Sequence, residues 1–376
     1  MKRLAFSTLL LLLGVATPPA PMPVAPVSFP FGPSSVTPYV VADGSGGFEV
    51  SWVDRGAKTF NLAHYDGSKW SKPNVIAHGD LLDNKADYPS IAASGPNVFA
   101  QWRERAGEGR RIRLARSSDG GTTWSAPVTP HPAMPREFGF VSMLPFADGT
   151  ARIAWLDGRR KGETELRAAT MSPAGILGAE SVVDPRVCDC CQTSMAMTAR
   201  GPLVVYRDRS TTEIRDISVA SPVAEARAIP LHDDHWHMAG CPVNGPSIAA
   251  RGKRLAVAWF TAADGRPAVK VAFSSDGGLT FGLPVRVDAG HPAGRVDLVL
   301  LDDGGSAVVT WVETATPAFH IVARHIVDGG PLDPVQTIGS GASIGFPRIA
   351  LSNERILAAW NGDDGVHLAL INPRKR

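Results

Sequence analysis

Short apolar segments that end in an aromatic residue and lead into a polar turn recur along the whole chain. Successive aromatic residues are separated by 50, 53, 51, 53, 52 and 49 positions. Such regular spacing predicts a repeat architecture in which each unit is one supersecondary element. The seven aromatic residues are Trp52, Trp102, Trp155, Tyr206, Trp259, Trp311 and Trp360.

Each unit also carries an apolar segment before and after the aromatic-ended one, such as residues 89–92 and 112–115 in the second unit. A fourth short segment follows a turn. Four strands in about 50 residues are typical of a propeller blade. The sequence therefore predicts an all-β, seven-bladed β-propeller over residues 38–376, with blades of four antiparallel strands. A six-bladed propeller of the sialidase type is the alternative.

The last unit lacks room for a fourth strand. We expect residues 24–31 to supply that outer strand and to close the ring, because an open ring leaves an unpaired sheet edge. The many glycines and prolines, 38 and 31, suit a chain with frequent tight turns and few helices.

The N-terminus has the pattern of a secretory signal peptide over residues 1–16. Lys2 and Arg3 precede an apolar stretch, and the small residues that a signal peptidase requires follow at residues 14–16. The stretch is shorter than the roughly 20 residues that a membrane span requires. Residues 17–37 form a Pro-rich linker and the closing strand. We expect a periplasmic or secreted protein with no membrane span after cleavage.

Charge excludes one class of partner. Removal of residues 1–16 takes away Lys2 and Arg3 and no acid, so 38 basic residues become 36, which balance 36 acidic ones. The one basic run is residues 374–376. Nucleic acid is therefore not an expected partner. We expect a monomer.

Two turns are nearly identical, Ser-Ser-Asp-Gly-Gly-Thr-Thr-Trp and Ser-Ser-Asp-Gly-Gly-Leu-Thr-Phe. They resemble the Asp box of sialidases and related BNR-repeat proteins. The resemblance implies turns between the third and fourth strands of a blade, away from the active face. The aspartates would accept backbone N–H bonds, and the glycines would adopt positive φ. The residues that carry the resemblance are Ser117, Asp119, Gly121, Trp124, Ser274, Asp276, Gly278 and Phe281.

A sialidase-type site would need three arginines for a carboxylate, a Tyr–Glu nucleophile and an Asp acid/base. The family's Phe/Tyr-Arg-Ile-Pro motif is absent here, and no tyrosine follows Tyr206. We therefore expect no ordinary sialidase activity. If the chain is an enzyme, the resemblance implies a glycosidase of that superfamily. The candidates for anion or substrate binding are Arg136, Arg207, Arg295 and Arg348.

Cysteine and histidine gather in two segments, each just before the first strand of a unit. Connections between successive propeller blades lie on one face. We therefore expect the two segments to be neighbours around the axis and to form one site. The candidate metal ligands are Cys188, Cys190, Cys191, His232, His235, His237, Met238 and Cys241.

Three chemistries fit this set. Export favours disulfides, one of which would tie the fourth unit to the fifth through Cys241. Thiolate, imidazole and thioether ligands favour Cu(I), with Zn(II) as the second metal. A redox-active dithiol is the third.

Three functions follow. The first is a binding propeller that holds a metal ion, copper before zinc. The second is a glycan-directed enzyme of the exo-α-sialidase type. The third is a structural or protein-binding propeller with disulfide-pinned loops. The sequence leaves the ligand open among a metal ion, a glycan and a protein.

Overall fold

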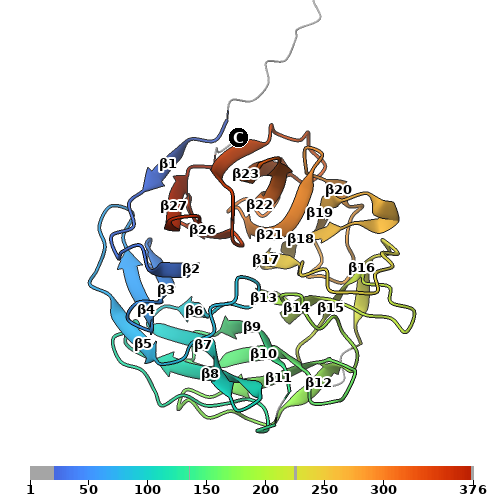
Figure 1. The fold of residues 1–376 in the computed structure, drawn as a ribbon. Helices are drawn as coiled ribbons and strands as arrows, with labels where there is room; N and C mark the ends of the chain where they lie inside the picture. The colour runs from blue at the N-terminus through green and yellow to red at the C-terminus, as the bar shows by residue number, and fades with distance from the viewer. Residues whose placement is uncertain (1–20, 135, 224–226, 374–376) are drawn as a thin grey trace, which may run out of the picture.

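The computed structural model describes residues 21–134, 136–223 and 227–373. Seven antiparallel sheets form a ring around a central axis (Figure 1). In the described part of the chain, six sheets have four strands and one has three. The predicted seven-bladed propeller is confirmed, and the six-bladed alternative is wrong.

The blades follow one another along the chain. Blade 1 contains β2 (Ser35–Ala42), β3 (Phe48–Asp54), β4 (Thr59–Tyr65) and β5 (Asn74–His78). Blade 2 contains β6 (Ser90–Ser94), β7 (Asn97–Ala106) and β8 (Gly109–Ser117). Blade 3 contains β9 (Phe138–Pro145), β10 (Ala151–Asp157), β11 (Glu165–Met171) and β12 (Ser181–Asp184). Blade 4 contains β13 (Ser194–Thr198), β14 (Gly201–Arg207), β15 (Ile217–Ala220) and β16 (Ile229–His232).

The remaining blades complete the ring. Blade 5 contains β17 (Ser247–Arg251), β18 (Arg254–Thr261), β19 (Ala268–Ser274) and β20 (Val285–Arg286). Blade 6 contains β21 (Pro292–Leu300), β22 (Ser306–Ala315), β23 (Ala318–Val327) and β24 (Gln336–Gly341). Blade 7 contains β25 (Arg348–Ser352), β26 (Arg355–Gly362), β27 (Gly365–Ile371) and β1 (Val24–Val27).

The second strand of each blade is apolar because both of its faces are buried. In β22, Val309 and Trp311 pack into a core shared with blade 5, whereas Val308 and Val312 pack into one shared with blade 7. Alternate side chains of a strand point to opposite faces, so burial of both faces produces a continuous apolar run. The recurring aromatic residue is therefore a contact between neighbouring blades.

The indole N–H of these buried tryptophans also needs an acceptor. A carboxylate two residues further along the same strand accepts it in three blades, at 3.0 Å for Trp102, 2.9 Å for Trp155 and 2.8 Å for Trp311. In these three blades, the pair explains why an acidic residue lies two positions after the tryptophan.

Closure of the ring joins the two ends of the chain. β1 lies beside β27 (Figure 1). The two strands pair antiparallel, from Val24 opposite Ile371 to Val27 opposite Leu368. Within the segment expected to close the ring, residues 24–27 form the strand. Met22 precedes it, is 6% exposed and packs into the core of blades 6 and 7. Both the backbone and this side chain therefore hold the ring shut.

The two serine–aspartate turns follow β8 and β19, the third strands of blades 2 and 5. In the first, Asp119 accepts hydrogen bonds from Ser117 and from the backbone and hydroxyl of Thr123, at 2.6, 2.9 and 2.6 Å. Gly121 has φ of 84°, and a Cβ there would lie 2.2 Å from Leu62 of blade 1. Glycine is required because the backbone is left-handed and the neighbouring blade approaches closely.

The second turn repeats this arrangement. Asp276 accepts bonds from Ser274 and Thr280 at 2.8 and 2.6 Å, and Gly278 has φ of 87°. In blade 5 the turn leads to the fourth strand, β20, whereas blade 2 has no fourth strand among the described residues.

The expected signal peptide, residues 1–16, lies outside the described residues. In residues 21–373, as far as they are described, no helix has the length and apolar character needed to cross a bilayer.

Met22→Ala is expected to destabilise the protein by about 2–5 kcal/mol, because it opens a cavity where the ring closes. Thermal or denaturant unfolding measures the loss. Met197→Ala is the control, because Met197 is 41% exposed on β13 and should change stability by no more than about 0.5 kcal/mol. Equal effects of the two changes would contradict this role for Met22.

Candidate functional site

Two inter-blade connections meet on one face of the propeller. The segment with Cys188, Cys190 and Cys191 leads from β12 into β13, and Cys241 lies between β16 and β17. A disulfide joins Cys190 to Cys241, with their Cα atoms 6.0 Å apart. The expected meeting of the two segments is therefore observed. We call this bond the surface disulfide, because Cys241 is exposed.

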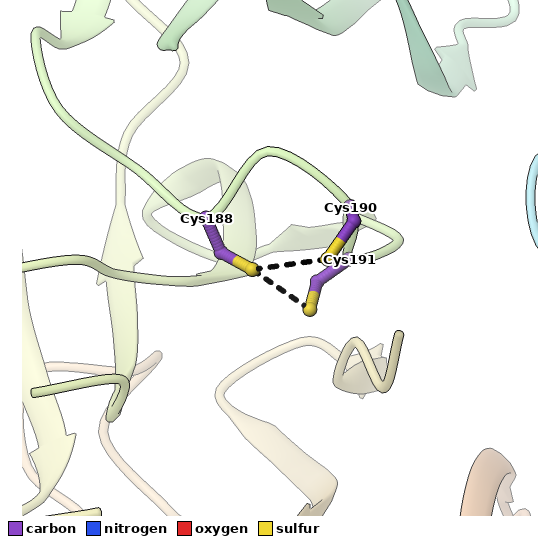
Figure 2. A group of neighbouring side chains, drawn as sticks. All are labelled: Cys188, Cys190 and Cys191. Carbon is purple, nitrogen blue, oxygen red and sulfur yellow. Dashed lines mark hydrogen bonds between the residues drawn. The ribbon is translucent and has the colours of Figure 1, made fainter. Parts of the chain in front are cut away.

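The other two cysteines are a buried thiol pair beside that disulfide. Cys188 and Cys191 are free and buried, and their Sγ atoms lie 3.0 Å apart. The Cys188 Sγ also lies 3.8 Å from the Cys190 Sγ. Figure 2 shows the Cys188 sulfur directed toward both neighbours. The structure thus contains one disulfide, which ties the fourth blade to the fifth through Cys241 as one of the expected chemistries required, and one free thiol pair.

The two buried thiols differ in acidity. The hydrogen bond with Cys191, a backbone hydrogen bond at Cys190 and the positive charges of Arg207 and Arg215 lower the pKa of Cys188 to about 7, although burial opposes this. Burial raises the pKa of Cys191 well above its ordinary value, and the hydrogen bond with Cys188 adds to the increase. Cys188 is therefore the more acidic thiol of the pair, and once deprotonated it accepts a hydrogen bond from the Cys191 S–H.

Arg207 is the buried residue that links the two connections. Its guanidinium donates to the carbonyl oxygens of Asn244, Arg215 and Phe260 at 2.9, 2.6 and 2.7 Å. It also stacks over the Trp236 ring, with 4.8 Å from Cζ to the ring centroid. The Arg207 carbonyl accepts a bond from the Cys188 N–H at 3.0 Å. Arg207 therefore holds both connections in place and puts a positive charge near the thiols.

Close backbone packing fixes the distance between the two connections. Gly245 donates its N–H to the Gln192 side chain at 3.0 Å. A Cβ at position 245 would lie 2.0 Å from the Gln192 carbonyl oxygen, so any larger residue would push the segments apart. This steric constraint explains why position 245, four residues after Cys241, is a glycine.

The histidines do not join the cysteines, which corrects the expected Cys/His metal site. Among the described residues, the two sets of potential ligand atoms within 4.8 Å are Cys188, Cys190 and Cys191, and Asp189, Cys190 and Cys241. Neither set contains His232, His235 or His237.

The cause is the way the segment folds around Trp236. Asp216 accepts the backbone N–H groups of His235 and Trp236 at 2.8 and 3.0 Å, and the Trp236 ring is buried. The neighbouring His235 and His237 side chains are consequently exposed. Met238 packs against the apolar core of blades 5 and 6.

A cavity of about 530 Å³ lies beside the surface disulfide, and Cys190 and Cys241 form part of its wall. Blades 2, 3 and 4 contribute most of the lining through the turns between their second and third strands and the connections between blades. We call it the basic cavity, because its lining includes six basic and three acidic residues. They are Arg103, Arg110, Arg136, Arg160, Lys161 and Arg209, with Glu137, Glu163 and Asp189.

The four arginines proposed from the sequence do not line one cavity. Arg136 lines the basic cavity, and Arg348 lines a smaller pocket in the central channel. Arg348 lies over the rings of Tyr39 and Tyr88, with Nη1 3.7 Å from an Asp297 oxygen. Arg295 donates to the Ile344 carbonyl and Arg207 to the carbonyls described above. A shared carboxylate clamp is therefore absent among these four described residues.

Lys161, Arg160 and Arg110 were not singled out from the sequence. The sequence offered one weak signal for them, since basic residues occur in the turns between the second and third strands of consecutive blades. Such residues are common on solvated surfaces, and only the closed ring brings these turns around one cavity.

Ultraviolet thiolate absorbance is expected to rise with a midpoint at about pH 7, because the native fold favours the Cys188 thiolate. Cys188→Ser should abolish this step. Cys191→Ala should move the midpoint upward, because the thiolate loses its hydrogen-bond donor. A step found only near the ordinary thiol value of about 8.5 in the native chain would contradict this assignment.

No protein-family model matches the sequence, and no curated protein matches it. Solved structures show the same fold at low identity. An ulvan lyase of polysaccharide lyase family PL25 is 12% identical, with a TM-score of 0.59 over 93% of this chain and 96% of that one. The GH93 α-L-arabinofuranosidase of Fusarium graminearum is 12% identical, with a TM-score of 0.52 over 90% of this chain and 93% of that one.

The Trypanosoma rangeli sialidase is 12% identical, with a TM-score of 0.47 over 90% of this chain and 54% of that one. The structural neighbours of this seven-bladed propeller thus include sialidases and other propeller glycosidases and lyases.

Proposed function

We propose that this chain is an exported propeller that carries out thiol–disulfide exchange at its cysteine cluster. One observation carries the proposal: the Cys188 Sγ lies 3.8 Å from the Cys190 sulfur of a disulfide and 3.0 Å from the Cys191 Sγ. Exchange requires attack of a thiolate on a disulfide sulfur, so a nucleophile, its target and a resolving thiol are already adjacent.

The first step replaces the Cys190–Cys241 disulfide by a Cys188–Cys190 disulfide. The Cys188 thiolate attacks the Cys190 Sγ, a Cys188–Cys190 bond forms and the Cys190–Cys241 bond breaks. Cys241 leaves as a thiolate and takes a proton from water, to which it is exposed. Exposure favours this leaving group because water solvates the charge.

The second step completes an internal transfer. Cys191 loses its proton and attacks the Cys188 Sγ, which breaks the Cys188–Cys190 bond and returns a proton to Cys190. The buried thiol pair is oxidised, and the surface pair is reduced. The two changes balance, so no external oxidant is needed. The buried pair would thereby supply reducing equivalents to the exposed face.

Two features of the site support this chemistry. Arg207 is fully buried, and Arg215 is 3% exposed, so their charges act on Cys188 with little screening. The buried Cys191 remains a thiol and can act after the first step. An unequal pair of this kind is typical of exchange-active dithiols.

Cys191→Ser is expected to stop the transfer after its first step. Part of the protein should then hold a Cys188–Cys190 bond, and Cys241 should be alkylated without added reductant. Mass spectrometry of alkylated peptides measures this. In the Cys188→Ser, Cys191→Ser double variant, Cys241 should stay protected. Protection of Cys241 in both variants would disprove the internal transfer.

Soft-metal binding is the second candidate, favoured by the three Sγ atoms of Cys188, Cys190 and Cys191 within 4.8 Å. In the reduced protein they would present three thiolates, which suits Cu(I) better than Zn(II). Competition with a Cu(I) chelator should show binding by reduced protein, lost in the Cys188→Ser, Cys191→Ser variant. Alanine at His232, His235 and His237 should leave it unchanged. Equal binding by the cysteine variant would exclude this site.

Glycoside hydrolysis of the sialidase type has less support. Tyr206 is buried and donates its hydroxyl to Asp184 at 2.7 Å, and burial together with the Asp184 charge raises its pKa. A phenol in that state is a poor nucleophile. A purely structural role would leave the unpaired Cys188 and Cys191 without a purpose, since the surface disulfide alone pins the two connections.

A further inference from the structure

The lining of the basic cavity indicates which class of molecule could react with the surface disulfide. We propose that it binds small anionic thiols, those carrying a carboxylate, sulfonate or phosphate, and presents their sulfur to the Cys190–Cys241 bond. This inference rests on the proposed exchange function and adds a specificity that the cysteines alone do not provide.

Size and position support a small-molecule ligand. The cavity volume of about 530 Å³ lies within the range of small-molecule sites, and both cysteines of the surface disulfide belong to its wall. Cys241 is exposed, so a bound thiol can reach the disulfide from the cavity side. A ligand held here would therefore have its sulfur next to the bond that exchanges.

Charge supports an anionic ligand. Four of the six basic residues already have a carboxylate partner: Arg103 with Asp87 at 2.9 Å, Arg110 with Glu137 at 3.1 Å, Arg160 with Glu163 at 3.1 Å and Arg209 with Glu213 at 2.9 Å.

No ion pair is found for the other two, Arg136 and Lys161, within the described part of the chain. Both are exposed on the cavity lining. Two uncompensated cations beside a concave surface raise the local concentration of anions. Asp189, the one acidic residue of the lining without a partner among these bases, offsets one of the two charges, so the lining keeps a net positive charge.

The exchange with such a ligand balances in two steps. The ligand thiolate attacks the Cys241 Sγ, so that a ligand–Cys241 disulfide forms and Cys190 leaves as a thiolate. A second ligand thiolate attacks the ligand sulfur of that mixed disulfide and releases Cys241. Two ligand thiols are oxidised to one disulfide, the surface disulfide is reduced, and the two protons lost by the thiols are taken up by Cys190 and Cys241.

Three thiols on the same two-carbon frame test the proposal: mercaptoethanesulfonate, mercaptoethanol and cysteamine. The readout is the rate of Cys241 release in the full chain at low salt. Each rate is divided by the rate of the same thiol with a small neutral disulfide, which removes differences in thiolate reactivity. We expect the sulfonate to be favoured over mercaptoethanol by about tenfold, cysteamine to be slowest, and the preference to shrink at high salt.

The Arg136→Gln, Lys161→Gln variant should lower the normalised sulfonate rate to that of mercaptoethanol. The charge-matched control is Lys69→Gln, Lys72→Gln, on the exposed turn between β4 and β5, which should retain the full preference.

Equal normalised rates for the three thiols, or an equal loss in both variants, would overturn the inference while leaving the internal transfer intact. The internal transfer is judged separately by Cys241 alkylation in Cys191→Ser, which needs no added thiol.

Discussion

The packing of apolar strands between neighbouring blades is the interaction on which the rest of the structure depends. Each second strand buries both faces, as in β22, where Trp311 and Val309 face blade 5 and Val308 and Val312 face blade 7. Because every blade needs a neighbour on each side, the array is stable only as a closed ring. β1 and Met22 complete that ring with residues from the far end of the sequence.

Closure also decides where chemistry can occur. The connections between blades return to one face, and the ring holds them at fixed distances. Gly245 lies against the Gln192 backbone, and Arg207 binds carbonyl oxygens of both neighbouring segments. The closed ring thereby brings together the sulfur atoms of the four cysteines, which lie between positions 188 and 241. A rigid scaffold that presents reactive groups on short connections is a common basis for function.

Within this cluster, burial separates the roles of chemically identical side chains. Cys191 is held as a thiol by burial, Cys188 becomes acidic through its neighbours, and Cys241 faces water beside the basic cavity. The same contrast explains the histidines: Trp236 takes the buried position in its segment, and His235 and His237 are left at the surface. Successive side chains of an extended segment point to opposite sides, so one side chain is buried while those of its two neighbours are exposed to solvent.

The sequence by itself determined the seven blades, the two serine–aspartate turns with their left-handed glycines, and the meeting of the cysteine segments. Each follows from local periodicity, or from the rule that equivalent connections share one face. Tertiary structure alone decided that Cys190 pairs with Cys241, that Cys188 and Cys191 stay free, and that the histidines lie apart. It also gathered Arg136 and Lys161 at one cavity. Pairing and ligand geometry depend on differences of a few ångströms between segments about 50 residues apart, and such distances are fixed by packing rather than by spacing in the chain.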